Sequence, residues 1–276
     1  MMGNQETIVV KCGGSVMSQL NDSFFQSLSR LAEQGYRLVV VHGGGPDIEG
    51  ILKQLNIQSE FVNGLRKTSA EVLDVVKMVL AGKVNKQLVM SLQACGLNSV
   101  GLSGCDGMLL ETEAINYEEL GYVGEVVNVN GELLRHLMEK EYVPVISSIG
   151  ANKEGESFNI NADLAAGAVA QALGAKQLLF VTDVQGIIKD GELLNEVTPV
   201  YIEQLINDGV IYGGMIPKVK SAIKALSSSL PKVQIVSGKS SFMNENGEWI
   251  GTTIQYTEDE AEGEAHEFFV SNVSTI

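Results

Sequence analysis

The sequence has few of the residues that mark several common classes of protein. Its 276 residues include three cysteines, Cys12, Cys95 and Cys105, which lie far apart and form no CxxC pair. Neither a disulfide framework nor a cysteine-based metal site is therefore expected, and the thiols fit a reducing compartment. Basic residues are also scarce: 19 Lys and Arg stand against 34 Asp and Glu, a formal net charge of -15. Such a chain lacks the field that attracts nucleic acid or an anionic membrane, and we expect neither as a partner.

Long apolar runs are missing as well. No run approaches the roughly 18 residues of a membrane-spanning helix. The short apolar run near the N-terminus is stopped by Lys11, which leaves no signal-peptide core. Hydrophobic residues nevertheless make up 45% of the chain, enough to bury a large core. We therefore expect a cytoplasmic globular protein.

Short apolar runs alternate with longer segments of helical period, the pattern of parallel strands joined by crossover helices. The strand candidates are residues 8–10, 38–41, 143–146, 178–181 and 233–236, and the helix candidates are residues 22–34, 46–55, 69–94, 161–173 and 216–228. Irregular, turn-rich stretches at 109–130 and 152–159 predict two hairpins. The fold class is therefore α/β with a mostly parallel sheet.

Two of the predicted strands end in glycine clusters, KCGGS at 11–15 and HGGGP at 42–46. Glycines let the backbone approach a ligand, and Pro46 at a first helical position places a helix N-terminus beside the second loop. Because open α/β sheets bind ligands at the carboxyl ends of their strands, the pair predicts a phosphate site. Two simple tight turns are the alternative. Neither loop is GxxxxGK[ST] or GxGxxG, which disfavours a Walker-type NTPase and a standard dinucleotide-binding fold.

Two later segments have related features. TDVQG at 182–186 follows a strong strand candidate, although alone it is more often a turn or cap. GGMIPK at 213–218 precedes a basic helix and places Lys218 near the helix start, where the dipole already favours anions.

In this order the segments resemble the amino-acid-kinase family. The motifs that match are KCGGS (11–15), HGGGP (42–46), NGLR (63–66), NINAD (159–163), TDVQG (182–186) and GMIPK (214–218), with matching spacing from about residue 7 to 254. The resemblance implies a three-layer αβα sandwich around the sheet. It implies an N-terminal lobe, 1–175, for amino-acid binding and dimerisation, and a C-terminal lobe, 176–256, for the nucleotide. We expect residues 257–276 to form a flexible acidic tail.

The resemblance also implies an activity. The NGLR motif favours the members that transfer the γ-phosphoryl group of ATP, with Mg²⁺, to the side-chain carboxylate of N-acetyl-L-glutamate in arginine biosynthesis. Phosphoryl transfer requires positioning and charge stabilisation, and an ionised carboxylate acceptor needs no general base. The presence of only three histidines agrees with this.

Matching positions carry the family's roles onto this chain. Lys11 and Lys218 would neutralise the phosphoryl group from opposite sides, with Asp163 pairing with both. The acceptor would be bound by Gly44, Gly45, Arg66 and Asn159, with the planar guanidinium suited to clamp the α-carboxylate. The nucleotide would be bound by Gly13, Gly14, Thr182, Asp183, Gly186 and Met215. We expect no metal ligand from the protein, and no chemistry is placed on His42.

Other interpretations stay open. A kinase of the same fold could act on an aminoadipate derivative, carbamate, aspartate, glutamate or a nucleoside monophosphate. A non-catalytic ligand sensor is a third possibility, disfavoured because Lys11, Asp163 and Lys218 occur together. Arginine-inhibited members carry an additional N-terminal helix that joins dimers into hexamers, and only about six residues precede the first strand here. We therefore expect a homodimer that is insensitive to arginine.

Overall fold

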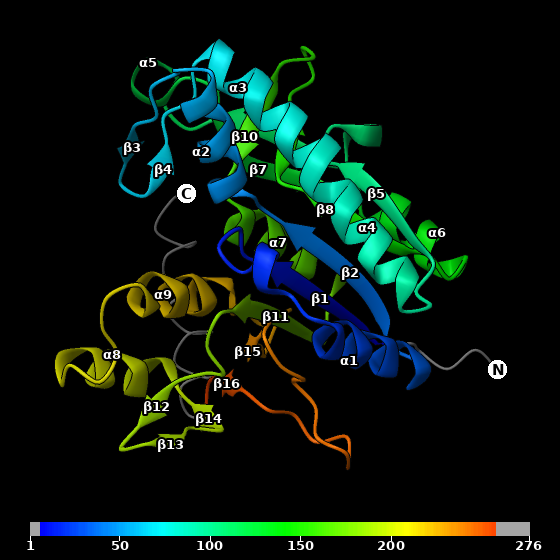
Figure 1. Ribbon diagram of the computed structural model, residues 1–276, viewed down its shortest axis with the longest axis vertical. Helices are drawn as coiled ribbons and strands as arrows, with labels where there is room; N and C mark the ends of the chain where they lie inside the picture. The colour runs from blue at the N-terminus through cyan, green and yellow to red at the C-terminus, as the bar shows by residue number, and fades with distance from the viewer. Residues whose placement is uncertain (1–5, 258–276) are drawn as a thin grey trace, which may run out of the picture.

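The computed structural model describes residues 6–257, so the predicted acidic tail lies outside the described residues from 258 onward. An eight-stranded sheet forms the centre of the molecule (Figure 1). In spatial order its strands are β14 (Glu196–Val197), β16 (Thr252–Ile254), β15 (Val233–Ser237), β11 (Gln177–Thr182), β1 (Thr7–Cys12), β2 (Arg37–His42), β8 (Val143–Ser147) and β5 (Ser99–Ser103). Only β15 and β16 pair antiparallel, which confirms a mostly parallel sheet.

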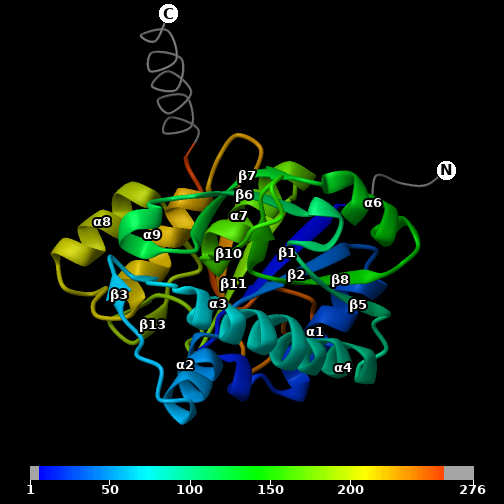
Figure 2. The same cartoon turned by 90° about the horizontal axis from the view of Figure 1, so that it is seen from above.

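The central strands are buried on both faces because helices cover the sheet on both sides. Side chains alternate along β1, so that Val9 packs in one core cluster and Val10 in the other. The helices that cover the Val9 face are α6 (Gly131–Glu139), α7 (Ala162–Leu173), α8 (Pro199–Asn207) and α9 (Met215–Ala225), and those that cover the Val10 face are α1 (Asp22–Glu33) and α4 (Asn85–Ala94). Figure 2 shows α7 and α1 on opposite sides of the sheet. The three-layer αβα prediction is therefore confirmed.

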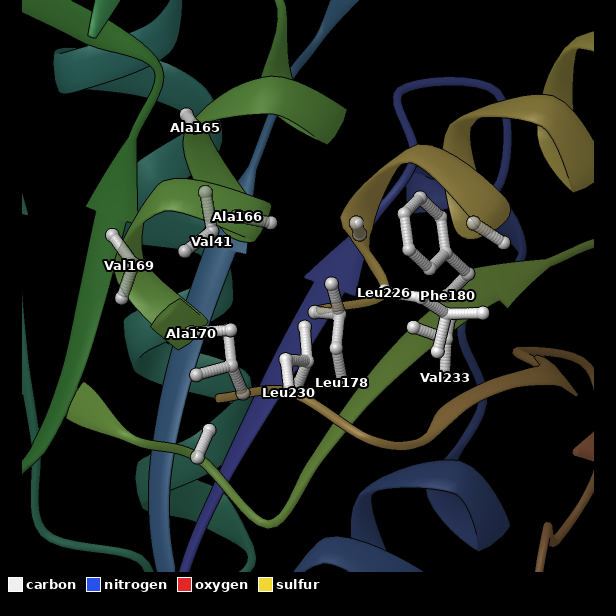
Figure 3. Packing of buried hydrophobic residues seen from close by; sticks show 14 of the residues in the cluster. Val41, Ala165, Ala166, Val169, Ala170, Leu178, Phe180, Leu226, Leu230 and Val233 are labelled. Atoms are coloured by element: carbon white, nitrogen blue, oxygen red, sulfur yellow. The ribbon is translucent and has the colours of Figure 1, made fainter. Parts of the chain in front are cut away.

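Small residues let α7 lie close to the sheet. Ala165, Ala166 and Ala170 of this helix are fully buried in the same core cluster as Val41 of β2, while Phe180 and its neighbours fill the space beside α9 (Figure 3). The helix begins at a polar cap, because the Asn161 side chain accepts hydrogen bonds from the backbone N–H groups of residues 163 and 164. The packing thus fixes both the axis of α7 and the position of its first turn.

The predicted helix 69–94 is interrupted. It consists of α3 (Ala70–Lys77), a π-helical segment (Met78–Val84) and α4, all continuous in the chain. The apolar spacing of three and four residues is compatible with one long α-helix, which is why the sequence did not reveal the wider turn. π-Helical turns are rare and frequently lie at functional sites. Here the segment lies beside α2 (Gly45–Gln54), which follows the second glycine loop.

The two predicted hairpins are confirmed, and they join into one closed four-stranded barrel. Its strands are β6 (Leu110–Ala114), β7 (Val123–Val129), β9 (Ile149–Ala151) and β10 (Ser157–Ile160). Strands β6 and β7 pair antiparallel, as do β9 and β10, whereas β10 pairs parallel with β7. The barrel packs beside α7 (Figure 2).

Two small hairpins follow from short turn sequences. β3 (Phe61–Val62) and β4 (Leu65–Arg66) are joined by Asn63 and Gly64, both with positive φ, as a two-residue type I′ turn requires. β12 (Ile188–Lys189) and β13 (Glu192–Leu193) are joined in the same way by an Asp-Gly pair. Short helical turns at α5 (Tyr117–Leu120), Met17–Gln19 and Asp106–Met108 complete the described elements. No helix within residues 6–257 is long and apolar enough to cross a membrane.

Candidate active site

The carboxyl ends of β1, β2, β8 and β11 meet at one edge of the sheet. Cys12 lies opposite His42 on one side and Val181 on the other, and His42 lies opposite Ser147. Beside this edge is a cavity of about 540 Å³. The predicted site residues that line it are Lys11, Gly14, Gly44, Gly45, Arg66, Asn159 and Asp163. Most of the predicted catalytic and acceptor-binding residues are therefore gathered around one space.

The two glycine loops contact each other at the N-terminus of α2. A Cβ atom on Gly14 would lie only 2.6 Å from the backbone nitrogen of Gly45 and 3.0 Å from Cδ of Pro46. The absence of a side chain at Gly14 thus allows the loops to meet. Helix α2 begins at Gly45, so the N–H groups of its first turn lie at the cavity. Such groups have no partner within the helix and favour a bound anion.

Lys11 lies at the end of β1 and forms an ion pair with Asp163 in the first turn of α7. Its Nζ is 2.5 Å from a carboxylate oxygen, and both side chains are largely buried, at 14% and 22% exposure. The ammonium group also lies 5.7 Å from the centre of the Phe180 ring. The first turn of a helix favours a carboxylate, and the capping contact of Asn161 fixes the backbone there. The pair places one oriented positive charge beside the glycine loops.

Arg66 is buried and surrounded by partners. Nη1 donates hydrogen bonds to Glu49 at 2.7 Å and to the hydroxyl of Ser59, and Nη2 donates to the carbonyl of Gly45 at 3.3 Å. The guanidinium stacks over the Phe61 ring, 4.6 Å from its centre. The Arg66 hydrogen bond holds the pKa of Glu49 below its usual range, with a further contribution from Ser59. Arg66 therefore presents a fixed guanidinium at the cavity.

A chain of hydrogen bonds joins Asn159 to the same region. The Asn159 amide donates to the hydroxyl of Thr68 at 3.1 Å, and that hydroxyl donates to the Arg66 carbonyl at 2.7 Å. Thr68 is fully buried. Thr68, Glu49 and Ser59 are not among the predicted residues, because nothing in their local sequence marks them as partners of a residue elsewhere in the chain.

The remaining predicted residues lie outside this cavity. Thr182 ends β11, Asp183 and Gly186 follow it, and Met215 and Lys218 belong to the first turns of α9. Lys218 pairs with Asp183 at 2.7 Å, whereas the prediction from the sequence was that it shares Asp163 with Lys11. This hydrogen bond lowers the pKa of Asp183. The predicted site residues therefore form two separate lysine–aspartate pairs, Lys11–Asp163 and Lys218–Asp183.

Two of the predicted glycines have a packing role in the structure. Gly13 is a buried residue of the first loop, and a Cβ atom there would lie 3.3 Å from Lys11 Nζ. Gly186 is buried against Leu193 and Thr252, whose atoms would overlap any side chain at this position. Neither glycine lines the cavity. Their small size is explained by close contact within the protein.

Comparison with known proteins agrees with this geometry. The model of the amino acid kinase family matches residues 6–237. An acetylglutamate kinase of Geobacillus sp. (strain WCH70) is 59% identical over 250 residues, which cover 91% of this chain and 97% of that protein. The solved structure of smu.665 from Streptococcus mutans UA159 is 32% identical with a TM-score of 0.78, covering 90% of this chain and 98% of the other.

A more distant solved structure has the same fold. The carbamate kinase from Giardia lamblia bound to AMP-PNP aligns with 93% of this chain and 100% of its own, with a TM-score of 0.65 and 19% identity. At this identity the likeness shows the fold alone. The family match and the 59% identity to the Geobacillus protein also establish the family to which the chain belongs. The chain therefore belongs to the amino acid kinase family, in its acetylglutamate kinase branch.

Proposed function

We propose that this protein transfers the γ-phosphoryl group of ATP to the side-chain carboxylate of N-acetyl-L-glutamate, a step of arginine biosynthesis. The named relatives support the reaction. The observation that carries the proposal is the cavity that combines Arg66, Asn159 and the Lys11–Asp163 pair beside two glycine loops. It offers a guanidinium for one carboxylate and an ammonium group with backbone N–H donors for a second.

At the acceptor end, Arg66 binds the α-carboxylate. A planar guanidinium pairs with a carboxylate through two parallel hydrogen bonds, so a fixed Arg66 selects both the charge and the orientation of the acceptor. Asn159 is held through its amide nitrogen by Thr68, and this orients the side chain toward the acylated amine. Free glutamate carries an ammonium group at that position and is the acceptor that the site discriminates against.

At the transfer end, the chemistry needs charge stabilisation. The side-chain carboxylate of the acceptor is already ionised at neutral pH, so the nucleophile is ready without a general base. Lys11 and the N–H groups of Gly44 and Gly45 stabilise the charge of the phosphoryl group on the acceptor side. Lys218, at the start of α9, supplies the positive charge on the nucleotide side, with Thr182, Asp183 and Met215 around the nucleotide.

Mg²⁺ would accompany ATP in this reaction. Within residues 6–257 no group of three or more His, Cys, Asp or Glu side chains could hold a metal ion. Asp163 and Asp183, the carboxylates at the predicted residues, are each paired with a lysine. These residues fit an ion carried by the phosphates of the nucleotide, as Mg²⁺ commonly is.

In this proposal each lobe binds one of the two substrates. Residues 1–175 hold the acceptor, a division supported by a cavity lined only by residues between 11 and 163. Residues 176–256 hold the nucleotide. We propose a homodimer, supported by the exposed apolar side chains of Met78 and Met90 along one continuous helical stretch. The three free cysteines support a reducing compartment, and we propose the cytoplasm.

The test is coupled ADP release with Mg-ATP and N-acetyl-L-glutamate, with free glutamate, an aminoadipate derivative and carbamate as alternative acceptors. Lys218→Ala is the matched variant. Activity that requires the acetyl group and falls by orders of magnitude in Lys218→Ala supports the proposal. Turnover only with another acceptor removes the substrate assignment, and no ADP release with any acceptor removes the enzymatic function. Analytical ultracentrifugation of the full chain tests the dimer.

A further inference from the structure

His42 is the first residue of the second glycine loop, and its side chain is buried in the protein. It is the last residue of β2, and its exposed fraction is 0%. Nδ1 of its ring is 2.9 Å from the carbonyl oxygen of Gly43, and Nε2 is 3.1 Å from the amide nitrogen of Asn85. Asn85 is also fully buried and is the first residue of α4, directly after the π-helical segment. Each nitrogen of this buried imidazole therefore has a polar partner, and the ring is held in one orientation.

The partners of Asn85 fix the direction of these hydrogen bonds. Its amide nitrogen also lies 2.8 Å from the Val145 carbonyl and 3.2 Å from the Leu102 carbonyl, which can only accept. Its amide oxygen accepts a hydrogen bond from Lys86 at 3.0 Å. The –NH₂ group of Asn85 therefore faces His42, and its two hydrogens are shared among three acceptors, the Val145 and Leu102 carbonyls and Nε2 of the ring. A proton on Nε2 would point at this donor group, so Nε2 carries none. The single ring proton of neutral His42 is then on Nδ1, where it donates to the Gly43 carbonyl.

This bond sets the orientation of the next peptide group. In a planar trans peptide the C=O of Gly43 and the N–H of Gly44 point in opposite directions. Because the Gly43 carbonyl is turned toward the buried ring, the Gly44 N–H points away from it. Gly43, Gly44 and Gly45 all line the cavity, and no residue within 6–257 accepts a hydrogen bond from the Gly44 N–H.

The π-helical segment supports the loop from the same side. A Cβ atom on Gly44 would lie 2.7 Å from Leu80 Cδ2 and 3.2 Å from Val84 Cγ2, both in this segment. The side chains of the segment thus pack against Gly44. Asn85, the residue directly after the segment, forms the hydrogen bond to His42. Steric contact and hydrogen bonding both hold the same peptide group.

We infer that His42 is a positioning residue for phosphoryl transfer: Asn85 selects its Nδ1–H tautomer, and the ring turns the Gly44 N–H into the cavity to meet the transferring phosphoryl group. The identity of that group rests on the proposed function, whereas the tautomer and the peptide orientation do not. Burial lowers the pKa of His42 to about 4, with a contribution in the same direction from Lys86, so the ring is neutral at pH 7. His42 needs to carry no charge and no proton to the substrate.

Two substitutions separate positioning from packing. The amide nitrogen of asparagine can occupy nearly the place of Nδ1, whereas that of glutamine reaches the place of Nε2. His42→Asn keeps a donor for Gly43, and His42→Gln does not. We expect His42→Gln to lower kcat by about 100-fold, the lower end of the range for loss of one donor to a developing charge. We expect His42→Asn to recover most of it, with the KM for ATP unchanged in both.

Equal losses of kcat in the two variants overturn the inference, as does a His42→Gln enzyme with the kcat of the wild type. Thermal unfolding of both variants shows whether each is folded. A direct readout needs no substrate: ¹⁵N NMR of the histidine side chains, with the His42 signals assigned by their loss in His42→Asn. A neutral ring protonated on Nδ1 at pH 7 supports the inference, and one protonated on Nε2 overturns it. Because this spectrum is recorded without ligand, it stays decisive if N-acetyl-L-glutamate proves not to be the acceptor.

Discussion

The ammonium nitrogen of Lys11 lies 2.5 Å from a carboxylate oxygen of Asp163, in a contact that is mostly shielded from solvent. The ion pair joins the end of β1 to the first turn of α7, two elements far apart in the sequence. The positive charge of Lys11 is therefore placed and partly compensated by the protein itself. In the proposed reaction, the phosphoryl group would compete with Asp163 for a lysine whose position is already fixed.

This pair gives a first prediction. We expect Asp163→Asn to lower kcat by about 100-fold, because a Lys11 without its carboxylate loses the orientation on which the transfer depends. The steady-state rate of ADP release at saturating substrates measures the effect. Lys153→Ala is a suitable control, since that lysine pairs with Glu111 on the surface of the barrel. A kcat for Asp163→Asn within twofold of the wild type would contradict the role.

Arg66 gives a second prediction. Lysine cannot reproduce the planar fork that binds a carboxylate through two hydrogen bonds. We expect both Arg66→Lys and Arg66→Ala to raise the KM for N-acetyl-L-glutamate by about 100-fold, the size of a lost charge-assisted bidentate contact. The KM for ATP serves as the internal control and should not change. Full acceptor affinity in Arg66→Lys would show that charge alone is sufficient.

The contact between the two glycine loops gives a third prediction, on stability. Because a Cβ atom on Gly14 would meet the backbone of Gly45, we expect Gly14→Ala to lower the free energy of unfolding by about 2 kcal/mol. A Cβ atom on Gly45 meets nothing within 4 Å. Gly45→Ala is therefore the matched control, with an expected change below about 0.5 kcal/mol. Urea titrations of the two variants give the comparison, and equal stabilities would refute the steric argument.

The buried His42 gives a fourth prediction, on pH. Its pKa falls from the usual 6.5 to about 4 in the folded protein, mainly through burial. Between these values the unfolded chain binds the proton and the folded protein does not, so stability is complete above pH 6.5 and falls as the pH drops toward 4. The loss reaches roughly 3 kcal/mol for this single group. Urea titrations across this range should show a steeper decline for the wild type than for His42→Asn, and parallel curves would contradict the prediction.

Much of the fold could be predicted because it depends on local pattern. All five strand candidates are strands of the central sheet, since each is a short apolar run that a parallel sheet buries on both faces. β5 escaped prediction because its sequence, SVGLS, is short and contains serine and glycine. The π-helical turn was not predicted because it differs from an α-helix in its backbone hydrogen bonds, and the hydrophobic composition of the segment does not record that difference.

Some residues of the candidate site could also be predicted from the local sequence, and others could not. Residues with special backbone requirements, such as Gly14, or with an evident charge, such as Lys11, are visible in the sequence. The partners that orient them are not. Glu49, Ser59 and Thr68 become recognisable only when folding places them around Arg66 or its backbone. No chemistry was placed on His42 because a histidine at a strand end is more often structural, and its partner Asn85 lies 43 residues further along the chain, on α4.

The order of the central strands has a consequence for synthesis. β1 is the first strand made, yet one of its two neighbours in the sheet is β11, and Ile8 pairs with Gln177. Until that second neighbour leaves the ribosome, an apolar strand at the heart of the future sheet has an open edge that other chains can pair with. Such long-range pairing also slows folding. A nascent chain that stops before residue 177 should therefore depend on chaperones and be prone to aggregation, even though every residue that lines the cavity beside the glycine loops has already been translated.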